Sequence, residues 1–543
     1  MSTDIASVTT AAGSIRNPIL SGFHPDPSIL RVGDDYYLAT STFEWYPGVR
    51  VHHSRDLVHW QALGGVITER RLLDLRGAGD SNGVWAPDLS YADGLFHLVY
   101  SDVASFASGY WDPQNYLITA PAIDGPWSDP IPLHAHGFDA SLFHDDDGSS
   151  WLLAMSADWR PGRDRFGGIE IQRYDRAERK LVGNARLIFE GTEVGLTEGP
   201  HIYRHDGWYY LLTAEGGTSW EHQVSIARSR SLFGPYLTDP AGPLLTSVGR
   251  PELRLQKAGH GSLVRTQTGQ WYLAHLVGRP YTPLGNCVLG RETALQRVEW
   301  PADGWPSIPG GVPADEIAAP DLPAHPWPAE PATDDFDDDS LGVSWSTLRR
   351  PAGPDWVDLS SRASHLRIFG GQSPVGRQKP SLVARRVGAT RCSLETVVEF
   401  DPADHRQLAG ITGYYNTANW YYAYLTRADD GRRVLEVLSC DSGRLTAHPD
   451  LSVDVSAADR VGLRVTFDGP VLRLAYRVGD GDGWHDLPAE FDATILSDEH
   501  AATVIDGEPA AWGFTGAFLG LWVQDLGADG VHADYDYATY LEH

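Results

Sequence analysis

The feature that most constrains the fold of this chain is a loose five-fold repeat in its first 300 residues. Each copy has two short, largely apolar runs around a polar turn, which is typical of a β-hairpin. Successive copies begin 60, 53, 59 and 62 residues apart. They are DPSILRVGDDYYLATS from Asp26, APDLSYADGLFHLVYSD from Ala86, DASLFHDDDGSSWLLAMS from Asp139, EGPHIYRHDGWYYLLTAE from Glu198 and HGSLVRTQTGQWYLAHL from His260.

Each hairpin is followed by further strand-like runs. Examples are VRVHHS, NYLITA, IEIQRY and VSIARS, and most are closed by a turn that carries an aromatic residue. Four strands per unit in five units predict a five-bladed β-propeller. No segment with helical periodicity competes with this all-β interpretation.

The residues that open the five units stand in equivalent positions. In a propeller the first strand of each blade lines the central channel, so we expect these residues to converge at one mouth of that channel. They are Asp26, Ala86, Asp139, Glu198 and His260. A single Asp at a strand start also suits a turn cap. Three carboxylates and an imidazole in one register favour a functional site, because buried acids are uncommon unless they are paired or used.

The second half of the chain has a different pattern. Residues 311–333 are rich in Pro and Ala, which predicts a stiff linker or a strap across a surface. Alternating apolar runs return from residue 334 and predict an antiparallel, lectin-like β-sandwich. We therefore divide the chain into a propeller (1–310), a linker (311–333) and a sandwich (334–543). The acidic run at 334–339 is interpreted as a solvated loop rather than a calcium site.

Charge and cysteine content exclude several classes of function. Acidic residues outnumber basic ones 72 to 43, a net charge of −29 that disfavours nucleic acid and anionic membranes as partners. Three cysteines provide neither a disulfide framework nor metal-ligand spacing. The first residues lack a signal-peptide pattern and no apolar stretch is long enough to span a membrane, so we expect a cytoplasmic location. The terminal Leu-Glu-His is interpreted as the start of a vector-derived tag.

The motifs themselves resemble a known family. The stretch NPILSGFHPDPSILRVGDDYYLATSTFEWYPGVRVHHSRDLVHW is similar to the opening of glycoside hydrolase family 43 β-xylosidases, and VWAPDLSY, GFDASLF, TEGPHIY, GHGSLV and LGRET follow in the family's order. GFTGAFLGLWVQD and HADYDY resemble the concanavalin A-like sandwich of the β-xylosidase/α-L-arabinofuranosidase branch. The resemblance covers almost the whole chain. It implies a five-bladed propeller and an inverting glycosidase.

The resemblance assigns roles to three carboxyl groups. Asp26, held between Pro25 and Pro27, matches the general base, and Glu198 matches the general acid. Inverting hydrolysis needs two such groups about 6.5–9.5 Å apart, with room for a water. The pKa of the acid must be raised, and Asp139 is the family's candidate for doing this by like-charge repulsion and for orienting Glu198.

The same resemblance suggests residues that contact the terminal sugar. These are Phe43, Trp85, Ala86, Thr218 and Arg291. The aromatic residues also suit a core position, and Arg291 suits an ion pair with a carboxylate. Phe518 matches a residue that the sandwich sends over the channel mouth, which would leave a short pocket for chain ends. In some relatives the histidine equivalent to His260 helps to hold a central divalent ion through water, so calcium in the channel is kept as an alternative to a site without cofactor.

The resemblance therefore implies an exo-acting, inverting β-1,4-xylosidase. An α-L-arabinofuranosidase or a bifunctional enzyme is the alternative, with xylo-oligosaccharides or arabinosyl compounds as substrates. A non-catalytic sugar-binding propeller is disfavoured because it needs neither Asp26 nor Glu198. The invertase-like family is disfavoured as well, because it has Asn where this chain has Pro25. An endo-arabinanase would need an open groove, which the sandwich should block. Relatives with this sandwich often form dimers or tetramers, so we expect a homo-oligomer.

Overall fold

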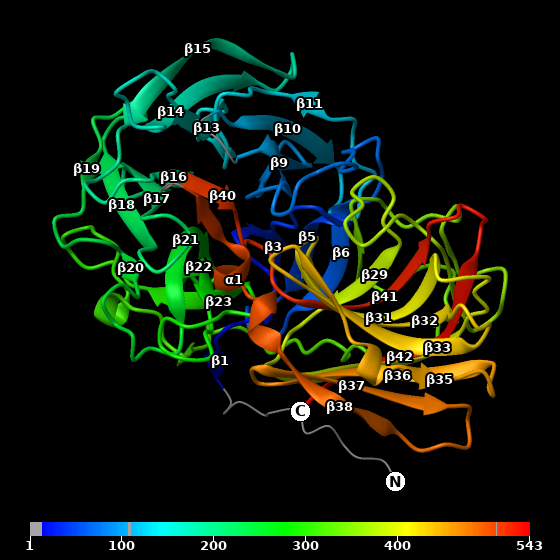
Figure 1. The fold of residues 1–543 in the computed structure, drawn as a ribbon. Coiled ribbons are helices and arrows are strands. Elements are labelled where there is room, and N and C mark those ends of the chain that lie inside the picture. The colour runs from blue at the N-terminus through cyan, green and yellow to red at the C-terminus, as the bar shows by residue number, and fades with distance from the viewer. Residues whose placement is uncertain (1–12, 107–109, 506–507) are drawn as a thin grey trace.

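The computed structural model describes residues 13–106, 110–505 and 508–543, and these residues are almost entirely β-structure (Figure 1). Within them the only α-helix is the single turn α1 (Asp498–Ala501), beside three short 3₁₀ turns. No helix in these ranges is long and apolar enough to cross a membrane. The 3₁₀ turns are η1 (Pro309–Gly311), η2 (Pro449–Leu451) and η3 (Ala493–Leu496).

The first 300 residues form five sheets around a common axis, as the repeat predicts (Figure 1). The innermost strands β2, β8, β12, β16 and β21 contact one another in a closed ring around the channel. From the first blade to the fifth the strands are β2 (Ser28–Val32), β3 (Asp35–Thr40), β5 (Gly48–Ser54), β6 (Gln61–Ile67); β7 (Gly83–Val84), β8 (Asp88–Ala92), β9 (Leu95–Ser105), β10 (Asp112–Ala120), β11 (Ile131–Pro132); β12 (Ser141–His144), β13 (Ser150–Ala157), β14 (Phe166–Asp175), β15 (Lys180–Phe189); β16 (Glu198–His205), β17 (Trp208–Glu215), β18 (Gln223–Ser229), β19 (Leu237–Thr238), β20 (Leu245–Thr246); β21 (Gln256–Arg265), β22 (Trp271–Gly278) and β23 (Arg291–Val298).

The fifth blade is closed by the N-terminal segment, which the sequence did not indicate. Its own sheet has three strands, and Ile19 and Leu20 donate backbone hydrogen bonds to the carbonyl of Thr293 on the outer strand β23. Asn17 adds two side-chain bonds to the backbone of Leu295. Strand β1 (Ser14–Arg16) then pairs with β24 (Glu316–Ala318). The N-terminal segment thus joins the last blade and the segment that follows it, which completes the ring.

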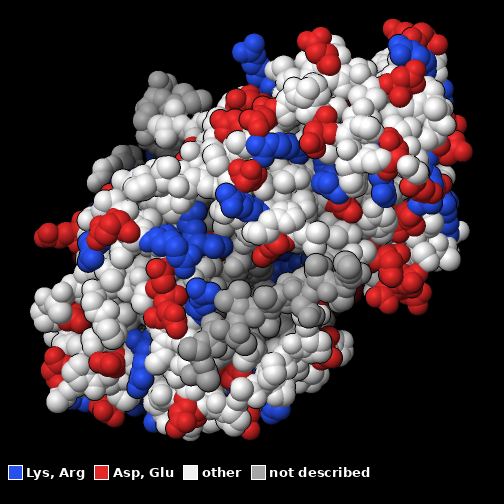
Figure 2. Space-filling model, turned by 90° about the horizontal axis from the view of Figure 1, so that it is seen from below, with Lys and Arg blue, Asp and Glu red and all other residues white. Residues whose placement is uncertain are grey.

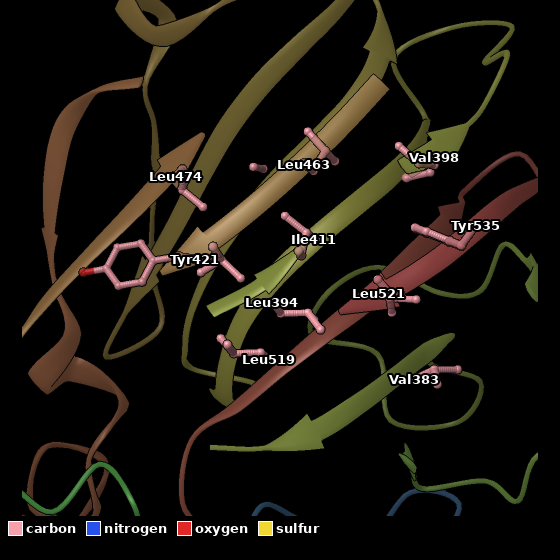
Figure 3. Packing of buried hydrophobic residues seen from close by; sticks show 14 of the residues in the cluster. Val383, Leu394, Val398, Ile411, Tyr421, Leu463, Leu474, Leu519, Leu521 and Tyr535 are labelled. Carbon is pink, nitrogen blue, oxygen red and sulfur yellow. The ribbon is translucent and has the colours of Figure 1, made fainter. Parts of the chain in front are cut away.

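The C-terminal domain is a sandwich of two antiparallel sheets whose facing side chains form one core (Figure 3). Val461, Leu463, Val465 and Phe467 alternate along one strand and are all buried, as expected for a strand with one face on the core. Sheet one contains β27 (Val357–Asp358), β28 (Leu366–Phe369), β42 (His532–Glu542), β30 (Arg391–Glu399), β36 (Arg460–Asp468), β37 (Val471–Val478) and β38 (His485–Asp492), with β25 (Thr333–Asp334) on β42. Sheet two contains β34 (Arg444–Ala447), β33 (Arg433–Asp441), β32 (Asn419–Arg427), β31 (Gln407–Asn416), β41 (Phe518–Asp525), β29 (Leu382–Arg386) and β26 (Trp345–Leu348), with β35 (Val453–Asp454) on β33.

The two domains share a sheet. Strand β4 (Trp45–Tyr46) leaves the first blade and pairs with β26, so that a propeller segment forms the edge of sheet two. A hairpin of β39 (Thr503–Ile505) and β40 (Glu508–Ala511) projects from the sandwich, together with α1, toward the propeller mouth (Figure 1). Backbone hydrogen bonds across β4 and β26 fix the orientation of one domain on the other.

The linker packs along the first blade. The backbone N–H of His325 donates to Asp56 Oδ2 at 2.6 Å, and the rings of Trp327 and His53 lie 5.0 Å apart. Charged residues of both signs are interspersed on the face seen in Figure 2, so the net negative charge is not gathered into one patch there.

Candidate active site

A cavity of about 610 Å³ lies at one mouth of the propeller channel, between the two domains. All five residues that open the repeats line it, which confirms the register argument. The propeller forms its floor and walls. The sandwich covers it with α1 and with residues 512–514, which we call the roof segment. The residues from the repeat openings are Asp26, Ala86, Asp139, Glu198 and His260.

Three of the floor residues, at or near the starts of innermost strands, have unusual backbone conformations. Asp26 and Asp139 each lie two residues before such a strand and have φ angles of 53° and 54°. His260, inside β21, has a φ of 39°. Left-handed backbone is unfavourable for residues with a Cβ and is concentrated at functional sites. Gly199 has no Cβ, and one added there would lie 2.9 Å from the His260 ring, so the close approach of β16 to this ring requires glycine.

Asp26 is held by two partners on opposite sides of its carboxylate. Ser41 Oγ donates to Oδ2 at 2.6 Å, and Arg291 Nη1 donates to Oδ1 at 3.0 Å. The same Arg291 nitrogen donates to Thr218 Oγ1 at 2.8 Å. The ion pair with a carboxylate, predicted as an alternative role for Arg291, is therefore formed with Asp26. Both Arg291 and Thr218 also line the cavity.

The other two carboxyl groups hold protons more tightly than free acids. Burial raises the pKa of Glu198 to about 8, with repulsion from Asp26 as the second cause. Burial also raises the pKa of Asp139 well above its usual value, followed by repulsion from Glu198 and Asp26. Arg291 opposes both shifts. Asp139 was expected to raise the pKa of Glu198, whereas burial and Asp26 do so here.

His260 lies between the two aspartates. Its Nδ1 is 4.0 Å from Asp26 Oδ1 and 4.0 Å from Asp139 Oδ2. Burial lowers its pKa to about 4, so the ring is neutral near pH 7. Within the described residues no group of three or more His, Cys, Asp or Glu side chains is arranged to hold a metal ion. Calcium prefers six to eight oxygen ligands, most of which would have to be water molecules here. Calcium in the channel therefore stays a prediction.

The walls of the cavity are aromatic. Phe43 and Trp85 both line it, 6.1 Å apart between ring centroids. Their contact with a terminal sugar stays a prediction. Sequence reasoning missed Phe106, Trp111 and Phe138, which extend this wall along the second and third blades. Phe106 and Trp111 occur in no motif used above, and Phe138 stands beside Asp139 in GFDASLF. Because aromatic residues are frequent throughout the chain, nothing distinguished the three from core positions.

Phe518 does not occupy the predicted position over the mouth. It is fully buried, stacks on Trp45 at 3.8 Å and lines no part of the cavity. Phe514, four residues earlier, takes that place: its ring lies 5.8 Å from Phe43 and 5.5 Å from Trp85. The reason is that β41 begins at Phe518, so this residue belongs to the sheet, whereas the segment before it crosses the mouth.

The roof segment also contacts the floor through its backbone. The carbonyl oxygen of Phe514 accepts hydrogen bonds from Arg291 Nε at 3.3 Å and Nη2 at 3.1 Å. The guanidinium lies between two rings, 5.3 Å from the centroid of Phe43 and 5.0 Å from that of Phe514. A residue of the sandwich therefore fixes the plane of the arginine that binds Asp26.

A second roof contact is a buried ion cluster. Lys257, 3% exposed, places Nζ 2.6 Å from Glu499 Oε1 and 3.4 Å from Asp498 Oδ2, both on α1. Tyr415 donates to the other oxygen of Asp498 at 2.9 Å. Burial raises the pKa of Asp498 to about 6. All three charged residues line the cavity, and no sequence pattern indicated them.

Comparisons with known proteins agree with this architecture. The family model described as glycosyl hydrolases family 43 matches residues 15–306, and the β-xylosidase C-terminal concanavalin A-like domain matches residues 333–541. The chain is 44% identical to a xylan 1,3-β-xylosidase of Vibrio sp. over 98% of this chain and 99% of that one. It is 42% identical to xylosidase/arabinosidase 43B of Humicola insolens, over 97% of each.

A solved structure is equally similar. The xylan β-1,4-xylosidase of Bacillus halodurans superimposes with a TM-score of 0.93 at 48% identity, covering 97% of this chain and 100% of that one. Both domains and the order in which they occur are shared with these relatives. This chain therefore belongs to glycosyl hydrolase family 43, in the group that carries the C-terminal concanavalin A-like domain.

Proposed function

We propose that this protein is an exo-acting, inverting β-xylosidase that releases xylose from the non-reducing ends of xylo-oligosaccharides. The observation that carries the proposal is the cavity at the channel mouth, where three carboxyl groups lie beside one arginine. A non-catalytic binding module has no need for such a cluster, since each buried acid costs free energy. The relatives named as β-xylosidases support the substrate class.

In the proposed reaction Glu198 donates its proton to the glycosidic oxygen as the bond to the leaving sugar breaks. A pKa of about 8 keeps this proton in place at neutral pH. Asp26, paired with Arg291, takes a proton from the water that attacks the opposite face of the sugar. Asp139 orients Glu198 and limits the net negative charge of the three carboxyl groups. No cofactor takes part in this step.

The roof of the cavity explains why the enzyme would act only at the ends of sugar chains. Phe514, Trp85 and Phe43 enclose the end of the cavity, so a chain can enter only by its terminus. Apolar ring faces suit the C–H face of a pentose, and Arg291 with Thr218 supplies polar contacts for its hydroxyl groups. The linkage we propose is β-1,4, and the Vibrio relative makes β-1,3 the linkage to test beside it.

The second candidate activity is α-L-arabinofuranosidase, alone or together with xylosidase activity. The relative named xylosidase/arabinosidase, 42% identical over 97% of the chain, favours testing it. An arabinofuranosyl group and a xylopyranosyl group present similar hydroxyl geometry to one pocket. Hydrolysis rates on aryl β-xyloside and aryl α-L-arabinofuranoside, measured with one preparation, give the ratio.

The defining experiment is proton NMR of xylobiose hydrolysis. Initial appearance of α-xylose supports the inverting β-xylosidase, and initial β-xylose contradicts the roles of Asp26 and Glu198. If xylobiose is not cleaved, the β-1,3-linked disaccharide and the aryl arabinofuranoside test the alternatives in the same tube. Absence of product from all three contradicts the enzymatic proposal.

We also propose a cytoplasmic location and a homo-oligomeric state. The three cysteines Cys287, Cys392 and Cys440 are buried and unpaired, which suits a reducing compartment. Imported xylo-oligosaccharides would then be the natural substrates. Light scattering after size exclusion distinguishes a monomer from the predicted dimer or tetramer, and fractionation of the source cells tests the location.

A further inference from the structure

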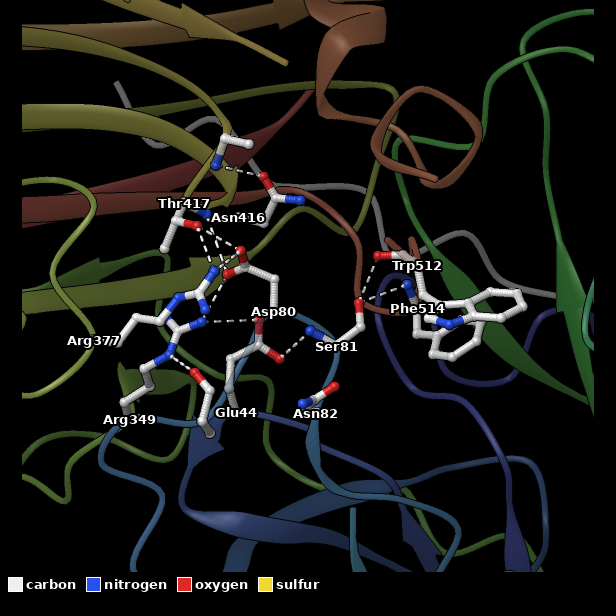
Figure 4. Close-up of polar contacts among 12 residues, drawn as sticks. Glu44, Asp80, Ser81, Asn82, Arg349, Arg377, Asn416, Thr417, Trp512 and Phe514 are labelled. Atoms are coloured by element: carbon white, nitrogen blue, oxygen red, sulfur yellow. Dashed lines mark hydrogen bonds and ion pairs between the residues drawn. The ribbon is translucent and has the colours of Figure 1, made fainter. Parts of the chain in front are cut away.

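We propose that Ser81 is a positioning residue that fastens the roof segment to the propeller and thereby orients Arg291 in the active site. The inference rests on the proposed function, because Arg291 matters for catalysis only if the cavity is the active site. Ser81 lies on the loop before β7, in the propeller, and is remote in sequence from the roof segment and from Arg291. Figure 4 shows it between the roof segment and a buried cluster of charged residues.

Every polar atom of Ser81 has a partner in or beside the cavity. Its Oγ donates to the carbonyl oxygen of Trp512 at 2.9 Å and accepts from the N–H of Phe514 at 3.2 Å. Its own carbonyl accepts from Trp85 Nε1 at 3.0 Å. Its N–H donates to Glu44 Oε2 at 3.1 Å. One small residue thus holds both the aromatic wall and the roof segment that packs against it.

The backbone of Ser81 indicates that its surroundings hold it in place. Its φ angle is 60° and its exposure is 2%. A left-handed conformation costs a non-glycine residue on the order of 1 kcal/mol, and it persists only where neighbouring contacts determine it. Those contacts come from Glu44 on one side and, through the adjacent residue Asp80, from the sandwich on the other.

The charged cluster joins the two domains at this point (Figure 4). Arg349 follows β26, the strand that pairs with β4 of the propeller, and is completely buried. Its Nη2 donates to Asp80 Oδ1 at 2.7 Å and lies 4.0 Å from Glu44 Oε1. Thr417 donates its backbone N–H to the same Asp80 oxygen at 3.2 Å. Because Arg349 and Glu44 are both completely buried, this cluster favours a single arrangement of the loop that carries Ser81.

The contacts form a continuous path to the catalytic base. Ser81 fixes the backbone of Phe514, the Phe514 carbonyl binds Nε and Nη2 of Arg291, and Nη1 of Arg291 binds Asp26. Loss of the Ser81 hydroxyl leaves the Trp512 carbonyl and the Phe514 N–H without their partner. The roof segment can then shift, and the arginine with it. A displacement near 1 Å at a reacting group costs roughly 100-fold in rate.

Two substitutions isolate the hydroxyl. Ser81→Ala removes it, and Ser81→Gly removes it while favouring the observed positive φ, so that the glycine variant should fold even if the alanine variant does not. The matched control is Ser229→Ala, which removes an equally buried hydroxyl that accepts from the Ser231 N–H at 3.1 Å and does not line the cavity. Aryl β-xyloside hydrolysis, inhibition by xylose and the melting temperature are measured for all four proteins.

Both Ser81 variants are expected to lower kcat/KM about 10- to 100-fold and to weaken xylose inhibition roughly tenfold, because the base and the sugar share Arg291. Ser229→Ala should keep wild-type values of both while losing a similar amount of thermal stability. Ser81→Gly with wild-type kcat/KM and xylose inhibition would overturn the inference. Wild-type protein without glycosidase activity would instead overturn the proposed function on which the inference rests.

Discussion

The floor and the roof of the cavity are built from different kinds of sequence. The floor residues Asp26, Asp139 and Glu198 occupy one register of a repeated unit, each at or just before an innermost strand. The roof residues Asp498 and Phe514 come from single, unrepeated segments of the sandwich. Repetition brings the floor residues together automatically, because every blade presents its first strand to the same axis. Each roof residue needs its own long-range contact.

This difference suggests that the floor and the roof of the cavity have different functions. In the proposed reaction the floor holds the groups that exchange protons. The roof binds Arg291 through the Phe514 carbonyl and covers the end of the cavity. Changes in the floor should therefore act on the chemical step with little effect on folding. Changes in the roof should act on stability, on sugar binding and on the interface between domains.

The largest expected effect comes from the floor. Glu198→Gln removes the proton donor while keeping size, and kcat on xylobiose should fall about 10²–10⁴-fold. Asp88→Asn is the matched control, because Asp88 is also a buried acid on an innermost strand, bonded to Ser28 Oγ and to the N–H of Leu142, but it does not line the cavity. If Asp88→Asn lost as much activity as Glu198→Gln, the acids that line the cavity would not differ in function from other buried acids of the channel.

The next effect concerns the roof. Lys257→Met leaves Asp498 and Glu499 without their buried cation, and such a loss costs about 3–5 kcal/mol of stability. Denaturant unfolding of the full chain measures it. Lys180→Met breaks a pair with Glu178 whose side chains are 60% and 65% exposed, and no measurable loss is expected. Equal stability of the two variants would contradict a structural role for the roof cluster.

The pH dependence of activity should follow Glu198. The acid works only while protonated, and since its pKa is raised to about 8, kcat/KM should hold through neutral pH and fall about tenfold per unit above that value. An unshifted glutamate would instead lose activity from pH about 4.5 upward. Initial rates on xylobiose between pH 5 and 10 distinguish the two cases, with stability checked at each pH.

The smallest expected effect concerns Glu44, in the buried charged cluster that joins the two domains. Burial raises the pKa of Glu44 to about 7, against the pull of Arg349. The folded protein then binds a proton more tightly than the unfolded chain, so this contribution to stability is present below pH 4.5 and is lost as pH rises toward 7. Glu44→Gln should flatten the slope of unfolding free energy against pH by at most about 1.4 kcal/mol per unit. Identical slopes for both proteins would show that Glu44 does not titrate in this window.

Two parts of the molecule illustrate what local patterns cannot give. The closure of the fifth blade depends on Asn17 meeting Leu295, and the roof depends on Ser81 meeting Phe514, pairs separated by hundreds of residues. Neither segment has a sequence pattern that predicts which distant residues it contacts. Phe514 and Phe518 share one aromatic motif, and only the start of β41 decides which ring reaches the cavity.

The sequence by itself determined the repeat, the all-β architecture and the register that brings Asp26, Asp139, Glu198 and His260 to one mouth. Hairpin spacing and strand alternation are local properties, and five-fold repetition turns them into a global arrangement. Only the tertiary structure decided the roof, the shared sheet of β4 and β26, and the cluster of Lys257 with α1. These depend on the way in which two domains dock, and docking is fixed by shape and buried charge across residues that the chain places far apart.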